Sequence, residues 1–209
     1  MCKVLRVQWT IVPRIAPRPW IVCSACGGLR PFQSSGKIRL NANGKKLDAW
    51  LIYKCLSCDK TWNRSIFERQ NVRDINQATL QALHANDPDW IRTQAFDFAA
   101  LRRKSQRIDE SSDIDVQKKA LSREGDAWMA LEIELIVPLP TGMRLDRLLA
   151  AELQISRSRL EIFHNAEKTR TDPGHKDMLR RRIKHGLRIT LDLSGEADLQ
   201  QIRKAAIGK

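Results

Sequence analysis

Four cysteines arranged in two pairs are the residues of this chain that are best suited to chemistry. Cys23 and Cys26 form one C-x-x-C pair, and Cys55 and Cys58 form the other. This spacing lets two thiolates from one tight turn face the same ion, and two such turns complete a closed tetrahedral shell of four sulfurs. The pattern predicts a structural zinc site. Iron is the alternative metal, because thiolate ligands accept both ions.

Redox thiols or two disulfides are the alternative role for these cysteines. A redox C-x-x-C is normally a single pair that opens a helix. Here the pairs are followed by Gly27-Gly28 and by Asp59-Lys60-Thr61-Trp62, which suit sharp turns and strands. All four histidines lie outside residues 20–73, so the predicted ligand set is four cysteines. A closed sulfur set predicts a scaffold role for the metal and no catalytic one.

The 28 residues that separate the two pairs are predicted to form an ordered connection, and their pattern favours a β-hairpin. Residues 37–41 alternate between polar and apolar types, Asn43-Gly44 favours a tight turn, and the apolar run Leu47 to Tyr53 leads into Cys55. Residues 1–73 are therefore predicted to form a β domain that resembles a four-cysteine zinc ribbon.

The middle of the chain, residues 74–127, is predicted to be a helical linker segment. Asn76 and the dipeptide Asp87-Pro88 are good helix starts. A further short helix is expected from Val116 to Leu121. We assign no chemistry to this segment.

Residues 128–209 are predicted to form a mixed domain of two helices and a small sheet. Alternation from Leu131 to Val137 predicts a strand, and Arg144 to Leu153 is an amphipathic helix. Ser156 is a good cap for a second helix, and Leu187 to Leu193 alternate as a closing strand. The fold class is therefore α+β, with a β module, a helical middle and a C-terminal α/β module.

The run R-L-D-R-L-L-A…L-x-I-S-R-S-R-L at residues 144–160 resembles the two-helix core of the ribosomal-protein-S-four-type RNA-binding domain. Gly186, which precedes the closing strand, extends the resemblance over residues 142–193. That family usually has a Val-Asn-Gly-like turn after the second helix, whereas this chain has Thr171-Asp172-Pro173-Gly174. The resemblance implies an RNA-binding domain with an altered hairpin.

Basic side chains on the two helices and in a later cluster are the candidates for contact with RNA phosphates. They are Arg144, Arg147, Arg157, Arg159, Arg180, Arg181, Arg182 and Lys184. The sequence predicts that the first four lie on the exposed face of the helices. A merely solvated helix face is the alternative reading of these arginines.

The net charge of +13 is distributed unevenly along the chain. Residues 1–73 contain 14 Lys/Arg against 3 Asp/Glu, residues 74–143 contain 8 against 12, and residues 144–209 contain 15 against 9. Basic ends that flank an acidic middle indicate a polyanionic partner, because neutralising phosphates releases condensed counterions.

Across its whole length the chain is similar to a bacterial family, domain of unknown function 1062. Three runs around the cysteine pairs carry this similarity: Asn41-Ala42-Asn43-Gly44-Lys45, Trp50-Leu51-Ile52-Tyr53 and Thr61-Trp62-Asn63. The similarity implies a fold but no activity.

The leading functional hypothesis is a non-enzymatic RNA-binding adaptor with a structural zinc site, acting on ribosomal or other structured RNA. One alternative is a protein–protein interaction module that uses the metal stretch together with Trp50, Tyr53 and Trp62. The other is an RNA-modifying enzyme, although the chain offers no nucleophile–base pair, phosphate loop or open metal site, and Asp146 fits an ion pair better than acid–base chemistry.

A cytoplasmic location without membrane association is expected. No apolar run approaches the roughly 20 residues that span a bilayer, and the N-terminus lacks the apolar core of a signal peptide. A reducing compartment also suits the five cysteines.

Overall fold

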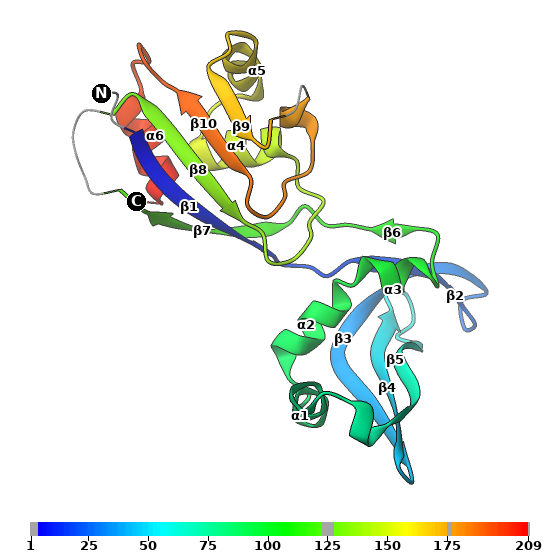
Figure 1. Cartoon of the computed structure of the whole chain (residues 1–209). Helices are drawn as coiled ribbons and strands as arrows, with labels where there is room; N and C mark the ends of the chain where they lie inside the picture. The colour runs from blue at the N-terminus through cyan, green and yellow to red at the C-terminus, as the bar shows by residue number, and fades with distance from the viewer. Residues whose placement is uncertain (1–3, 123–127, 175–176, 209) are drawn as a thin grey trace. The chain divides into compact units, whose positions relative to one another are not determined.

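The computed structural model describes residues 4–122, 128–174 and 177–208, and its contacts divide the chain into two units. The first, here called the split unit, comprises Met1–Arg14 and Ser111–Lys209. The second, the inserted unit, comprises Ile15–Glu110. The whole inserted unit therefore lies in the connection between the first strand of the split unit and the next one (Figure 1).

The split unit is built on a five-stranded sheet of order β7-β1-β8-β10-β9. Its strands are β1 (Val4–Pro13), β7 (Ile114–Ala120), β8 (Ala130–Ile136), β9 (Thr169–Asp172) and β10 (Arg188–Asp192). Strands β1 and β8 run parallel, and all other neighbours are antiparallel. Its helices are α4 (Leu145–Leu153), α5 (Arg157–Asn165), α6 (Leu199–Ile207) and the short 3-10 turn η2 (Met178–Arg180).

Alternation along the strands creates the core of the split unit. Val7, Trp9 and Ile11 of β1 are buried, whereas the residues between them are half-buried. Because successive side chains of a strand point to opposite faces, the odd residues pack under the helices, and each fully buried large apolar side chain stabilises the fold by about 1.5–3 kcal/mol. The C-terminal end of α6 is tied to this sheet, since Trp9 Nε1 donates to Ala206 O at 2.8 Å and Lys118 Nζ donates to Ala205 O at 2.8 Å.

The inserted unit has a second, antiparallel sheet of order β5-β4-β3-β2-β6. Its strands are β2 (Arg18–Cys23), β3 (Gly28–Asn43), β4 (Lys46–Cys55), β5 (Thr61–Asn71) and β6 (Ile108–Asp109). Its helices are α1 (Gln77–Ala85), α2 (Pro88–Ala95), α3 (Phe98–Arg102) and the 3-10 turn η1 (Val72–Asp74).

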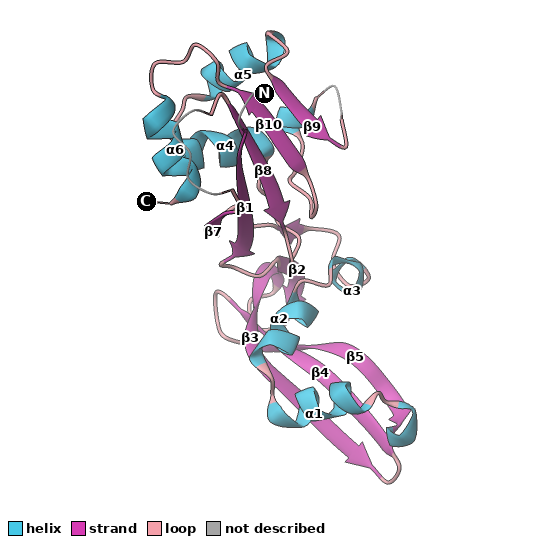
Figure 2. Ribbon diagram, turned by 60° about the vertical axis from the view of Figure 1, so that its left-hand side comes forward, coloured by secondary structure: helices cyan, strands magenta, loops and turns pink. Residues whose placement is uncertain are grey.

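Helices α1 and α2 lie on one side of the β3–β4–β5 sheet (Figure 2). Their starts are as predicted: Asn76 Oδ1 accepts the N–H of Ala78, and Asp87 Oδ1 accepts the N–H of Trp90. The apolar face that they cover is formed by alternate residues of β4, including Leu51 and Tyr53, which are fully buried. Packing against the helices therefore fixes which side of this sheet is internal.

The α+β class is confirmed, since the described residues form two sheets and six helices. The prediction of a helix from Val116 is wrong, because residues 114–120 form β7, which pairs with β1 over its whole length. The helix that begins after Asp87 ends at Ala95, and Asp97 Oδ1 accepts the N–H of Ala100 and caps a separate helix α3.

The division into units also differs from the expected ranges 1–73, 74–127 and 128–209. Strand β1 pairs with β8, so the first residues of the chain belong with its last hundred. Helices α1 to α3 join the cysteine-containing sheet instead of forming a separate linker. Local patterns could not reveal either pairing, because both depend on contacts between distant parts of the sequence.

No helix in the described part of the chain has both the length and the apolar character that crossing a membrane requires.

Candidate metal centre and basic surface

Two turns of the same construction present the four cysteines. Cys23 ends β2 and Cys55 ends β4, and in each case the chain reverses sharply after the strand. The N–H of Gly27 donates to Cys23 O at 3.0 Å, and the N–H of Asp59 donates to Cys55 O at 3.0 Å. Gly27 (φ +68°) and Asp59 (φ +59°) both have left-handed backbone, so each turn closes at the residue after its second cysteine.

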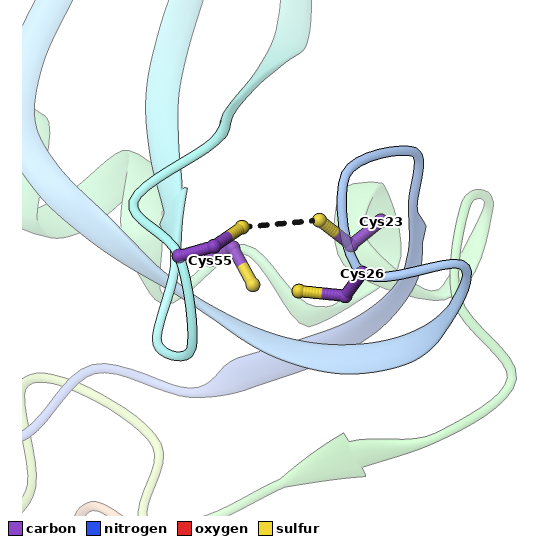
Figure 3. Close-up of side chains that lie close together, drawn as sticks. Cys23, Cys26 and Cys55 are labelled. Atoms are coloured by element: carbon purple, nitrogen blue, oxygen red, sulfur yellow. Dashed lines mark hydrogen bonds between the residues drawn. The ribbon is translucent and has the colours of Figure 1, made fainter.

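The four sulfurs lie within 4.8 Å of one another, and those of Cys23 and Cys58 are 3.5 Å apart. Figure 3 shows the side chains of Cys23, Cys26 and Cys55 pointing toward a common centre. A disulfide needs about 2.05 Å, and all four cysteines are free. Four sulfurs at about 2.3 Å from a zinc ion form a tetrahedron with edges of about 3.8 Å, so this cluster fits one tetrahedral ion.

Proton affinities within the cluster are uneven. Burial opposes ionisation of Cys23, but hydrogen bonds from the backbone of Cys26 and from the Cys58 thiol outweigh it and lower the pKa of Cys23 to about 7. The pKa of Cys26 is raised to about 12, first by its hydrogen bond with Cys58 and then by burial. The cluster therefore favours the thiolate form at Cys23, and an ion that binds there must displace the proton of Cys26.

Apolar side chains surround the two turns on the outside. Val22 is 69% exposed, Leu29 is 54% exposed and Leu56 is 50% exposed. Val22 and Leu29 face each other across β2 and β3, and the N–H of Leu56 donates to Pro31 O. These three side chains do not pack against the core clusters of the described residues, so this end of the unit exposes an apolar surface to solvent.

The predicted two-helix element in the split unit is centred on a buried carboxylate. Asp146 Oδ2 lies 2.9 Å from Arg144 Nη2 and 2.6 Å from Arg157 Nη2. Its side chain is 7% exposed, whereas those of Arg144 and Arg157 are 33% and 52% exposed. Asp146 also accepts the N–H of Arg147. The prediction of an ion-pair role for Asp146 is confirmed, and the pairing orients two guanidinium groups from different helices side by side.

The backbone brings the later basic cluster to the same place. Arg144 and Arg182 form an isolated antiparallel bridge. The N–H of Leu145 donates to Arg181 O at 3.0 Å, and the N–H of Ile183 donates to Met143 O at 3.1 Å. A cavity of about 410 Å³ lies beside this junction. It is lined by Thr171, Pro173, Met178, Arg181, Arg182, Lys184, His185 and Leu187.

Arg159 does not join this surface, in contrast to its predicted exposed position. Its guanidinium lies 2.6 Å from Glu196 Oε2 and 2.6 Å from Asp198 Oδ2, and its side chain is 29% exposed. Hydrogen bonds with Asp198 and then Glu196 raise its pKa. Arg159 therefore ties α5 to the segment that leads into α6. Arg180 has a looser partner, Glu161, at 3.8 Å.

The structure also separates the three aromatic residues that the sequence grouped around the metal stretch. Tyr53 is fully buried, and the Trp62 ring packs on it with centroids 5.2 Å apart. Trp50 is three residues from Tyr53 on β4 and therefore points to the opposite face. The alternation of side chains along a strand could have shown from the sequence that Trp50 and Tyr53 lie on opposite faces.

Comparison with known proteins identifies a family that matches most of the chain. The sequence model of a family described as "Protein of unknown function (DUF1062)" matches residues 40–174. No curated protein and no solved structure matches the chain. The matched range includes Cys55 and Cys58 and the two-helix element, whereas the first cysteine pair and the Arg180–Lys184 cluster lie outside it.

Proposed function

This chain belongs to the DUF1062 family, as its sequence predicted, and from its own geometry we propose that it is a non-enzymatic RNA-binding adaptor. In this proposal a structural zinc ion stabilises the fold of the inserted unit. The split unit binds structured RNA through the basic surface around Arg144, Arg181, Arg182 and Lys184. A reducing cytoplasm, which preserves thiol ligands, is the proposed location.

One observation carries the RNA-binding proposal: two basic groups that are distant in sequence meet at one backbone junction. The bridge between Arg144 and Arg182 places the helix pair beside Arg181 and Lys184. Asp146 neutralises only one of the two guanidinium groups that it binds. A net positive charge thus remains on a surface that adjoins a cavity, which suits phosphate binding.

The order of elements supports the resemblance to the S-four-type domain. Two helices, α4 and α5, are followed by the short strand β9, the 3-10 turn η2 and the closing strand β10. Structured RNA is the favoured ligand, because proteins often recognise it by shape and backbone contacts instead of base sequence.

The zinc proposal rests on the closed set of four sulfurs. When bound, the ion would cross-link the turn after β2 to the turn after β4, and it would leave no open coordination position for catalysis. We expect one zinc per chain by elemental analysis of protein purified without added metal. Bound iron would keep the scaffold role and correct the metal, whereas two disulfides in the purified protein would contradict the proposal.

The RNA proposal is best tested at basic side chains that form no ion pair with a carboxylate. Within the described residues, Arg181 and Lys184 have no ion pair, and both line the cavity. We expect Arg181→Gln with Lys184→Gln to weaken binding of a labelled RNA hairpin and to reduce the log–log salt slope by about 1.4 to 1.8. The matched control, Lys119→Gln with Lys204→Gln, removes two exposed charges elsewhere on the same unit. Equal losses from both variants, or no loss from the first, would contradict this assignment.

Arg144 and Arg157 are unsuitable as test positions, since their replacement would strand the buried Asp146 and confuse binding with folding.

A protein–protein module is the second candidate, and a specific observation favours it. Val22, Leu29 and Leu56 expose apolar surface around the cysteine turns, and exposed apolar patches commonly mark protein interfaces. Under this alternative, Val22→Ser with Leu56→Ser would abolish association with a partner while RNA binding stays unchanged.

A further inference from the structure

The inserted unit has a sheet face that its helices leave uncovered. On β4, Leu51 and Tyr53 are buried beneath the helices, so Trp50 and Ile52 point the other way. Both are half-buried, and neither belongs to the core clusters of the unit or packs against them. The strand register places Arg39 opposite Trp50 and Lys37 opposite Ile52. An aromatic ring therefore lies among cations on an open surface.

The cations of this open face have no acidic partners. Lys37, Arg39 and Lys54 are exposed, and none of them forms an ion pair with any residue in the described ranges. Two carboxylates lie nearby: Glu68 Oε1 accepts from Trp50 Nε1 at 3.4 Å, and Asp48 Oδ1 accepts the N–H of Arg69 at 2.6 Å. Both donors are neutral, so the carboxylates keep their charge, and the three cations leave this face with a small net positive charge.

The positive surface continues around the edge strand β5. Ser65 is the cross-strand neighbour of Trp50 and also lines a cavity of about 370 Å³. Arg103 and Lys104 line the same cavity, together with Glu68. A chain that crossed the Trp50 ring would therefore meet further cations at the edge of the sheet.

We infer that this open face, with Trp50 at its centre and Lys37, Arg39 and Lys54 around it, binds single-stranded RNA. A partly exposed aromatic ring offers a stacking surface for an unpaired base, and the flanking cations bind the adjacent phosphates. A duplex could use only the cations, because its bases already stack on one another. The site lies outside the split unit and does not depend on the RNA site proposed there.

The stacking role of Trp50 is tested with a labelled oligouridine of about 12 nucleotides. We expect Trp50→Ala to weaken its binding about tenfold, within the range that the loss of one base–aromatic stack produces. Trp50→Phe, which keeps an aromatic face, should recover most of the affinity, and a duplex of equal length should bind Trp50→Ala nearly as well as the wild type.

The charge contribution is tested by Lys37→Gln with Arg39→Gln. This variant should reduce the log–log salt slope for oligouridine by about 1.4. Lys119→Gln with Lys204→Gln is again the control with equal loss of charge. Equal reductions in the two variants would mean a general charge effect and would overturn the inference.

Two further outcomes decide the case. Wild-type affinity of Trp50→Ala for oligouridine overturns the inference and leaves the face to a protein partner. If Trp50→Ala fails to fold, photo-crosslinking of wild-type protein to 5-bromouridine RNA decides instead, since the inference requires a crosslink in the peptide that contains Trp50. Arg181→Gln with Lys184→Gln reports separately on the split unit, so failure at one site is distinguishable from failure at the other.

Discussion

The two units carry almost the same net charge but use their cations differently. The inserted unit, residues 15–110, has 16 Lys/Arg against 9 Asp/Glu, and the split unit has 21 against 15, which gives +7 and +6. In the split unit, Arg144, Arg157 and Arg159 bind carboxylates of the same unit. On the open face of the inserted unit, Lys37 and Arg39 have no such partner among the described residues. The number of cations is therefore a poor guide to where a polyanion binds, and their pairing is a better one.

The units also differ in what holds them together. A single large cluster of buried residues fills the split unit, from Leu5 of β1 to Ala206 of α6. The inserted unit has two smaller clusters, and Cys23 and Cys55 belong to the larger of them. Small cores usually need a cross-link such as a metal or a disulfide. The cysteine cluster is therefore expected to matter for stability in the inserted unit alone.

The largest expected effect comes from Cys55→Ser. Structural zinc binding of about 10–16 kcal/mol exceeds the stability of most domains, so this variant should lose the metal and the folded inserted unit. The split unit should keep its thermal transition. Calorimetry with elemental analysis measures both changes, and Ser57→Ala, in the same turn, is the control that should retain metal and stability. Metal retained by Cys55→Ser with an unchanged transition would show that the two units do not differ in this way.

Asp146→Ala should have the next largest effect. It leaves the guanidinium groups of Arg144 and Arg157 facing each other without their shared carboxylate. Loss of a buried partner costs about 3–5 kcal/mol, and the partial exposure of both arginines reduces this to about 2–4 kcal/mol. Urea unfolding of the split unit measures the change. Glu161→Ala removes a looser, exposed partner of Arg180 and should cost less than about 0.5 kcal/mol. Equal costs would mean that burial of the carboxylate is unimportant.

Arg159→Gln should have a smaller effect on stability than Asp146→Ala, about 1 kcal/mol, because its ion pairs are partly exposed. Its pH dependence identifies the cause. The hydrogen bond from Arg159 lowers the pKa of Asp198, so the stabilisation is complete above the unfolded pKa of about 3.9 and is lost as the pH falls below it. The difference between wild type and Arg159→Gln should therefore shrink below about pH 4.

Arg39→Gln on the open face is the control for this comparison. It should leave the free energy of unfolding within about 0.5 kcal/mol at every pH, since it breaks no pair. A cost as large as that of Arg159→Gln would contradict the distinction between paired and unpaired cations.

Much of the local structure could be predicted from the sequence. The two C-x-x-C pairs converge as their spacing indicated, and the caps at Asn76, Asp87 and Ser156 begin helices as expected. These features depend on a few neighbouring residues, so a short window contains the information. The helix predicted from Val116 failed for the opposite reason: β7 exists because β1 pairs with it, and β1 lies about a hundred residues earlier.

The sequence by itself determined which four cysteines converge, the secondary structure near strong caps and turns, and the excess of positive charge. Only the tertiary structure decided which parts of the chain form a unit and which cations stay unpaired. The acidic middle of the sequence does not form a separate region in the structure, because β7 and β8 lie in one sheet with β1. Arg159 forms ion pairs within the unit, because Glu196 and Asp198 lie beside it in the folded chain. The physical reason is common to all of these cases: spacing along the chain fixes local geometry, whereas burial and ion pairing depend on distances that only the folded chain creates.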